Sequence, residues 1–332
     1  MRKANSVKKT SPFIFFAFIA IAFCNYSSAQ TITKADRKQL ELKEDSLKDR
    51  ASYMVLDTIA AGRLLAYKDF VPVLIRALKV KNSFYYPFDS VQGISKLYAP
   101  DSSFRIFTWY IEIDDYSGWQ RGFIQQRTSD GSLKGNWLFD NSEYAEYPEK
   151  MVCRDSTWIG AVYYDIIKTE YQGKNFYTLF GIDRYAIRSD RKWIEVLTFD
   201  DKKQPVFGGQ YFSFQEDSIK KTTQSRFGIE FKEEARTLVD YIPDLKMILV
   251  DHLISETDEP DNFSTYVPDG DYEGFKWQNG KWVHIDKVFN LKLEDGQAPI
   301  GDPLLDIKGK KDENKLQQKS DSNKVKKPGG NN

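Results

Sequence analysis

Two runs near the middle of the chain set the pattern of the fold. Residues 175–183 and 192–200 each carry aromatic and β-branched residues on both alternating sets of positions. Successive side chains of a strand point to opposite faces, so a run that is apolar on both sets is buried on both faces. We therefore predict that these runs are central strands with other structure covering each side.

The N-terminal part of the chain follows a helical pattern instead. Leu40, Leu47 and Met54 recur at seven-residue intervals, which places them on one face of a helix. Thr33, with Asp36 three residues later, resembles a capping box at its start. This apolar face is predicted to pack on the sheet, with a coiled-coil partner helix as the alternative.

The pattern also predicts where the helices end. One long helix is expected over residues 33–67, bent at Gly62. A shorter helix is expected over residues 69–80, with Pro72 in its first turn, where a missing backbone N–H does no harm. The helical segment as a whole is assigned to residues 30–82.

From residue 83 to residue 302, strand-length runs follow one another through short turns, with no helix between them. Parallel strands need long crossover connections, so this order favours antiparallel pairing. The predicted fold class is α+β, mainly β, with N-terminal helices packed on a large antiparallel β-meander. A curved sheet, a sandwich and an open barrel all fit this description.

A hairpin is predicted around Gln172-Gly173-Lys174, with Gly173 at positive φ. A two-residue hairpin is expected here, and the register predicted for it places Ile167 opposite Phe180 and Tyr171 opposite Phe176. The pairing is local and antiparallel.

The two ends of the chain differ in composition from the segment that is predicted to fold. Residues 1–29 are interpreted as a secretory signal peptide, because a basic start precedes twelve apolar residues and the small residues Ser27, Ser28 and Ala29. A lipoprotein anchor at Cys24 is the alternative. Residues 303–332 are polar and charged and are predicted to be a disordered tail. The chain is therefore expected to be exported to the periplasm or the exterior, and not to span a membrane, since no apolar run is long enough.

Charge and cysteine content narrow the functional classes. Removing the four basic residues of the leader from the 48 Lys and Arg leaves 44, against 48 Asp and Glu. This slight acidic excess does not favour a nucleic-acid partner. Cleavage also removes Cys24 and leaves Cys153 as the one cysteine, so an internal disulfide is excluded and a packing role is expected for Cys153.

Few residues offer catalytic chemistry. The chain has two histidines, His252 and His284, and no Gly-x-Ser-x-Gly nucleophile motif. His252 lies in a run that is apolar on both sides, so it is predicted to be buried with a satisfied hydrogen bond. The alternative is a hydrolase in which His252 or His284 acts as a general base with a nearby carboxylate.

The Asn279-Gly280 dipeptide predicts a second hairpin, and its two-residue loop creates a candidate ligand site. Such a loop places Trp277 opposite Trp282 and Phe275 opposite His284 on one face. If exposed, this face could stack on a sugar ring or bind an apolar ligand. Burial against a neighbouring layer is the competing interpretation.

A second candidate site is acidic. Asp269, Asp271 and Glu273 alternate along the chain just before the aromatic face, so their carboxylates could converge on Ca²⁺. Their spacing does not match an EF-hand loop, and a solvated acidic surface is the alternative. No other cofactor is predicted.

Four phrases of the sequence resemble a family of secreted proteins from Bacteroidota-type bacteria to which no activity is assigned. They are Phe104–Trp109, Tyr177–Gly181, Asp251–Leu253 and Tyr266–Gly270. The resemblance covers about residues 99–289. It implies export and a single β-rich unit, and transfers no functional residue.

Taken together, these patterns predict an exported, non-enzymatic binding or structural module of the cell envelope. Its ligand or protein partner is not indicated. A half-barrel that carries lipids or lipoproteins is an alternative based on fold analogy alone, and a histidine-dependent hydrolase is the other.

Overall fold

The computed structural model describes residues 31–114, 117–184 and 186–289, and the predicted signal peptide and polar tail lie outside these residues. The described chain forms two compact units. The N-terminal unit comprises residues 31–114 and 121–138, and the C-terminal unit comprises residues 117–120 and 139–289. Two helices precede three mostly antiparallel sheets, which confirms the predicted α+β, mainly β class.

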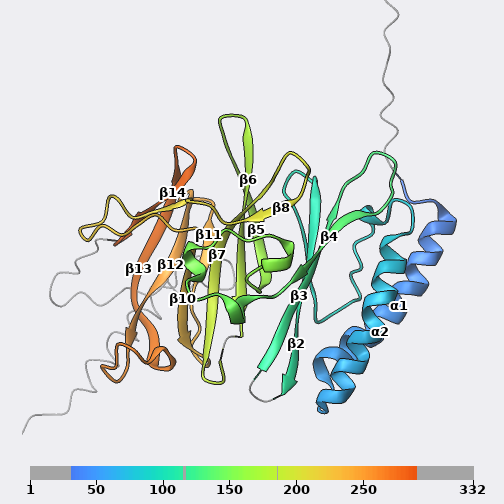
Figure 1. Cartoon of the computed structure of the whole chain (residues 1–332), viewed down its shortest axis with the longest axis horizontal. Coiled ribbons are helices and arrows are strands. Elements are labelled where there is room, and N and C mark those ends of the chain that lie inside the picture. Colours follow the sequence, from blue (N-terminus) through green and yellow to red (C-terminus); the bar gives the residue numbers. More distant parts are fainter. Residues whose placement is uncertain (1–30, 115–116, 185, 290–332) are drawn as a thin grey trace, which may run out of the picture. The chain divides into compact units, whose positions relative to one another are not determined.

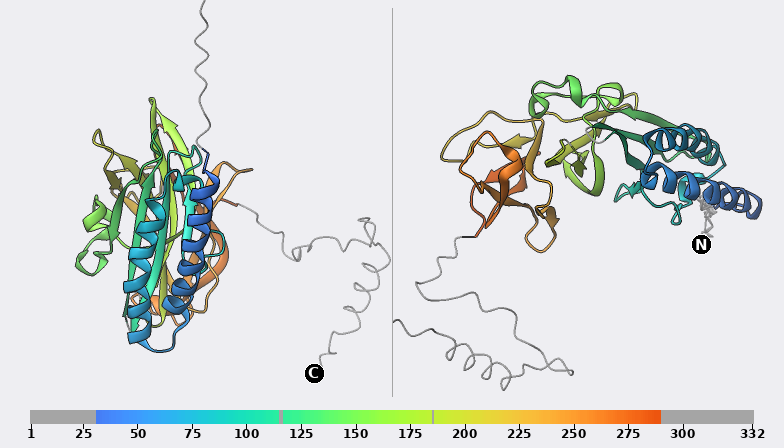
Figure 2. Two further views of the ribbon diagram at one scale, coloured as in Figure 1. Left: turned by 90° about the vertical axis from the view of Figure 1, so that its right-hand side faces the viewer. Right: turned by 90° about the horizontal axis from the view of Figure 1, so that it is seen from below.

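The N-terminal unit places two helices against a four-stranded sheet in which sequential strands are neighbours (Figures 1 and 2). Its elements are α1 (Lys34–Leu56), α2 (Ala60–Leu78), a 3-10 turn (Ser83–Tyr85), β1 (Ser95–Tyr98), β2 (Phe104–Asp114), β3 (Ser117–Gln126) and β4 (Lys134–Phe139). Leu40, Leu47 and Met54 are buried in the core between the helices and β2, as their spacing predicted.

The predicted cap of the first helix at Thr33 is confirmed, but the predicted break between the two helices is wrong. The first helix ends at Leu56 and a second begins at Ala60, so the break precedes Gly62, and Pro72 lies inside α2 and not in its first turn. The side chain of Asp57 turns back to accept a hydrogen bond from the Ile59 N–H at 2.9 Å, which favours a sharp turn there. α2 continues past the proline because Phe70, Val73 and Leu74 on its inner face are buried, and this packing outweighs one missing helical hydrogen bond.

The C-terminal unit contains two five-stranded sheets. The first has the order β10-β7-β6-β5, with β8 paired to β7, and the second has the order β11-β12-β13-β14-β9. The strands are β5 (Val162–Tyr171), β6 (Lys174–Asp183), β7 (Ser189–Phe199), β8 (Pro205–Phe207), β9 (Phe212–Ser213), β10 (Arg226–Lys232), β11 (Val239–Ile242), β12 (Met247–Ser255), β13 (Tyr266–Gln278) and β14 (Lys281–Ile285). Short 3-10 turns cover Ser142–Tyr144, Pro148–Lys150, Asp155–Thr157 and Phe263–Thr265.

These two sheets share one hydrophobic core. Phe180 and Ile194 from the first sheet belong to the same buried cluster as Ile248 and Trp282 from the second. The indole N–H of Trp282 donates to the Thr178 hydroxyl at 2.9 Å, which joins the two faces by a hydrogen bond. The C-terminal unit is thus a sandwich, one of the three arrangements that the sequence left open. Its short β9 pairs parallel with β14, so the pairing is not antiparallel throughout.

The central-strand prediction is confirmed, because β6 pairs with β5 on one side and β7 on the other. The predicted register of the β5–β6 hairpin is wrong by two residues: Tyr171 lies opposite Lys174 and not Phe176. The loop contains only Gln172 and Gly173, both with positive φ (48° and 73°), the geometry of a type I′ turn. A shift of two residues keeps each side chain on its predicted face.

Candidate functional site

The predicted aromatic face forms with the expected register and lies inside the sandwich. Trp277 pairs with Trp282 and Phe275 pairs with His284 across the Asn279-Gly280 turn. Phe275 and Trp282 are fully buried, His284 is almost fully buried, and Trp277 is partly exposed. Buried rings cannot stack on a sugar or an external apolar ligand, so this face is core, as the competing interpretation expected.

Both ring nitrogens of His284 lie within hydrogen-bond distance of a carboxylate. Nδ1 lies 2.8 Å from Asp217 Oδ2, in the link between β9 and β10, and Nε2 lies 2.9 Å from Glu273 Oε2 on β13. The imidazole also packs against the rings of Phe214 and Phe275, each with a centroid distance of 5.0 Å. Burial disfavours the imidazolium, but the hydrogen bonds to Glu273 and Asp217 outweigh it and raise the pKa of His284 above its ordinary value. To act as a general base, His284 would first have to break its hydrogen bonds to both carboxylates.

The predicted calcium ligands each have a different partner. Asp269 binds His252, Asp271 binds Lys287 with a 2.7 Å contact, and Glu273 binds His284. Within the described ranges, no group of three or more His, Cys, Asp or Glu side chains is placed to hold a metal ion. The calcium site gains no support from this arrangement and is not carried into the proposal below.

The prediction that His252 is buried is wrong. Its side chain is about half exposed, and Nδ1 lies 2.8 Å from Asp269 Oδ2. The register between β12 and β13 shifts between Asp251 and Leu253, so His252 lies at a β-bulge, which re-aims side chains out of the strand pattern. The bulge leaves Asp251 buried and turns the imidazole toward solvent.

Sequence reasoning missed a buried ion pair in the sandwich. Glu195 on β7 and Arg226 on β10 are both almost fully buried, with Arg226 Nη2 3.0 Å from Glu195 Oε2. The hydroxyl of Tyr163 donates to the other oxygen of Glu195. Cys153 lies 3.6 Å from the guanidinium, and burial raises the pKa of its thiol, which fits the packing role expected for it. Arg226 lies directly opposite Glu195 on the neighbouring strand, but 31 residues later in the chain, and such a pairing leaves no local sequence signal.

A second missed group is a carboxyl of the sandwich. Asp183, at the end of β6, is almost fully buried and accepts from the Gln120 side chain, whose backbone N–H faces Asp140. Burial, and then the charge of Asp140, raise the pKa of Asp183 to about 7. Its proton is therefore exchanged in the neutral range.

The N-terminal unit buries the guanidinium of Arg105, which has no carboxylate partner among the residues that the structure describes. Arg105 donates to Gln125 and to backbone oxygens of Ser83 and Tyr86, over distances of 2.6–2.9 Å. Its guanidinium carbon lies 4.7 Å from the ring centroid of Phe107 and is flanked by three further aromatic rings. Burial lowers the pKa of Arg105 to about 10. Carbonyl oxygens and ring faces replace a counter-ion, which makes this cage a structural element.

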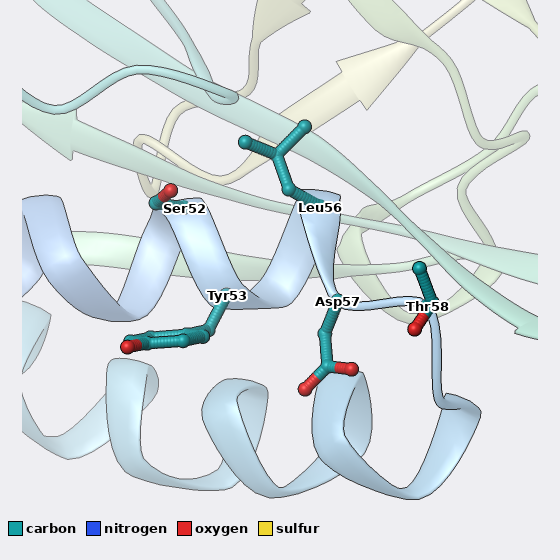
Figure 3. Close-up of a pocket in the computed structure, with 5 residues that line it drawn as sticks. All are labelled: Ser52, Tyr53, Leu56, Asp57 and Thr58. Carbon is teal, nitrogen blue, oxygen red and sulfur yellow. The ribbon is translucent and has the colours of Figure 1, made fainter.

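The end of the helical pair, residues 51–62, exposes several large apolar side chains. Tyr53, Val55, Leu56 and Ile59 are exposed there, with Leu56 73% and Ile59 65% accessible. An open depression of about 350 Å³ lies beside Ser52, Tyr53 and the α1–α2 turn (Figure 3). We call residues 51–62 the hairpin end.

The hairpin end is a fixed structure. Arg63 at the start of α2 is buried and donates to the backbone oxygens of Asp57 and Glu112, at 2.8 Å and 2.7 Å. It thereby ties the α1–α2 turn to β2. A Cβ added at Gly62 would overlap the Asp57 carboxylate, so this side chain lies over the first turn of α2. The exposed apolar side chains are therefore displayed from a braced turn.

No protein-family model, curated protein or solved structure matches this chain. The resemblance to secreted Bacteroidota-type proteins accordingly stays a prediction. Among the described helices, none combines the length and apolar character needed to cross a bilayer.

Proposed function

We propose that this chain is an exported binding or structural module of the cell envelope that contacts its partner through the hairpin end. The observation that carries the proposal is the exposure of Tyr53, Leu56 and Ile59 on a turn fixed by Arg63. Large apolar side chains that protrude together from a rigid surface are typical of interaction sites.

The arrangement of the polar groups supports a binding role over a catalytic one. Inside the sandwich, Glu195 and Arg226 form an ion pair with each other. His284 forms hydrogen bonds with the carboxylates of Asp217 and Glu273. Such groups stabilise one rigid packing, and rigid elements are good platforms for a fixed contact surface. The export of the chain rests on the leader-like residues 1–29.

A site-specific crosslink tests this function. A photoreactive residue replaces Leu56 in the full-length chain, in the cells that make it, and an otherwise identical chain carries the same residue at Leu42. Leu42 is also on α1 and is 63% exposed, but it lies more than three helical turns from Leu56. We expect crosslinks to an envelope component from position 56 and few from position 42. Equal crosslinking from both positions would rule out the hairpin end as the contact surface.

A hydrolase that uses His252 is the second candidate. The contact of 2.8 Å between His252 Nδ1 and Asp269 Oδ2 leaves Nε2 without a hydrogen-bond partner among the described residues, the arrangement of a histidine oriented by a carboxylate. Turnover of ester or phosphoester substrates that is lost in H252A would favour this candidate. No nucleophile is assigned to it.

The lipid-carrier alternative requires a large apolar cavity between sheet and helices. The depression in Figure 3 is lined by α1 and the α1–α2 turn and lies on the surface of the helical pair. It does not have the form of a carrier cavity. The carrier role is therefore not favoured by this feature.

A further inference from the structure

We propose that the partner of the hairpin end is a lipid surface, into whose interfacial layer Tyr53, Leu56 and Ile59 insert. This inference rests on the proposed function and names the occupant of the same site. Three observations support it: the low charge content of residues 51–62, the small size of the apolar surface, and the contacts of Asp57, the one charged residue of the segment.

The hairpin end is almost free of charge in a chain that is rich in it. Asp57 is the single charged residue between Arg50 and Arg63, whereas 29% of all residues are Asp, Glu, Lys or Arg. Its carboxylate accepts the Ile59 N–H and lies against the first turn of α2, where the partial positive charge of a helix N-terminus stabilises it. Apart from Asp57, which lines the open depression, residues 51–62 carry only apolar or hydroxyl side chains.

A second exposed apolar segment provides a contrast within the same chain. Phe139, Tyr144 and Tyr147 are exposed in the C-terminal unit. Residues 139–152, however, contain five charged side chains, Asp140, Glu143, Glu146, Glu149 and Lys150. Burying such a segment in lipid would desolvate several charges, which costs far more than its apolar groups gain. The hairpin end does not have this obstacle.

The size of the surface favours lipid over a protein partner. Stable protein interfaces bury about 800 Å² on each partner and draw on about 20–30 residues. The hairpin end offers four large exposed apolar side chains, of Tyr53, Val55 and Leu56 in the last turn of α1 and of Ile59 in the link to α2. A bilayer interface needs no complementary shape, because each inserted side chain gains its transfer free energy independently. Tyr53 adds a ring with a polar tip, which suits the headgroup level.

The test uses fluorescent labelling of single cysteines in the mature chain. Cys153 is buried and so resists labelling, which allows an environment-sensitive NBD dye to be attached selectively at L56C or L42C. The probe surface is a vesicle of phosphatidylcholine and phosphatidylethanolamine, with and without nitroxide-labelled lipid. We expect a blue shift and nitroxide quenching for dye at position 56 and neither for dye at position 42.

Unlabelled variants extend the test to affinity. L56S and I59S are each expected to lower the vesicle-bound fraction at limiting lipid by about tenfold, since each removes the burial of one large apolar side chain. L42S is expected to bind as the unmodified chain does. Because these side chains are exposed, far-UV circular dichroism should be unchanged in all three. Raising the salt concentration should leave binding intact, since few charges take part.

Two results separate this inference from the proposed function. If the mature chain stays in the aqueous fraction, or positions 42 and 56 respond alike, the lipid surface is ruled out. The proposed function then still stands if position 56, and not 42, crosslinks to an envelope protein in cells. Failure of both the vesicle and the crosslinking experiments overturns both.

Discussion

The Nε2 atom of His284 lies 2.9 Å from Oε2 of Glu273, eleven residues earlier on the neighbouring strand. This contact joins two features that appear separate in the sequence, an aromatic hairpin face and an acidic stretch. Asp217 lies against the other nitrogen, so hydrogen bonds to two carboxylates favour the protonated imidazole and raise the pKa of His284. Both ring nitrogens of His284 are engaged by carboxylates, so the main effect of these three side chains is on the stability of the fold.

We predict that the stability provided by His284 decreases as the pH rises. Its pKa is higher in the folded state than in the unfolded state, so the favourable contribution is complete below about pH 6.5 and is lost as the pH rises through the folded value. Urea unfolding of the chain and of H284Q between pH 6 and 9 measures this. The difference in unfolding free energy should be largest near pH 6 and should shrink with rising pH. A constant difference would contradict the prediction.

The Arg226–Glu195 pair makes a prediction about buried charge. R226M should destabilise the chain by about 3–5 kcal/mol, because it leaves the Glu195 carboxylate buried without its counter-charge. The double variant R226M/E195Q should recover a large part of this loss, since it removes the uncompensated charge. Denaturant unfolding followed by tryptophan fluorescence measures both. The exposed pair Arg154–Asp200 is the control, and R154M should cost less than about 1 kcal/mol.

Local patterns in the sequence were sufficient for part of this fold. The β13–β14 register follows from Asn279-Gly280, whose φ values of 50° and 79° are those of a type I′ turn. The buried face of α1 follows from a seven-residue repeat. Both signals involve residues close together along the chain, and their geometry depends little on the rest of the fold.

Other features depend on partners that are distant along the chain. Glu195 and Arg226 are 31 residues apart, and His284 and Asp217 are 67 apart. Neither pairing leaves a periodic signal. The exposure of His252 depends on a bulge between β12 and β13, and the α1–α2 break depends on the Asp57 side chain and on Arg63. The candidate surface at the hairpin end was missed because one continuous helix was expected over residues 33–67, with its apolar face packed on the sheet.

The buried Asp183 carboxyl also predicts a loss of stability with rising pH, but in a lower pH range and because here the charged form is the unfavourable one. Its pKa is raised to about 7 in the folded state, so ionisation opposes folding increasingly as the pH rises from about 4 to 7. D183N, which keeps an oxygen that can accept from Gln120, should therefore be more stable than the unmodified chain at pH 7. The advantage should disappear near pH 4. Thermal unfolding at both pH values measures it, and equal melting temperatures at pH 7 would contradict it.

We predict that the effect of a Gly62 substitution on stability depends on the neighbouring Asp57 side chain. Replacing an exposed helical glycine by alanine usually stabilises a protein by about 0.5–1 kcal/mol. In G62A, however, the new methyl group would overlap the Asp57 carboxylate and push it from the Ile59 N–H, which costs a cap of about 1 kcal/mol. We therefore expect G62A alone to be neutral or slightly destabilising. In a D57A background the cap is already lost, so the same substitution should raise the unfolding free energy by the usual amount. Urea unfolding of the four chains of this double-mutant cycle measures the coupling, and equal effects of G62A in both backgrounds would show that Asp57 does not restrict this position.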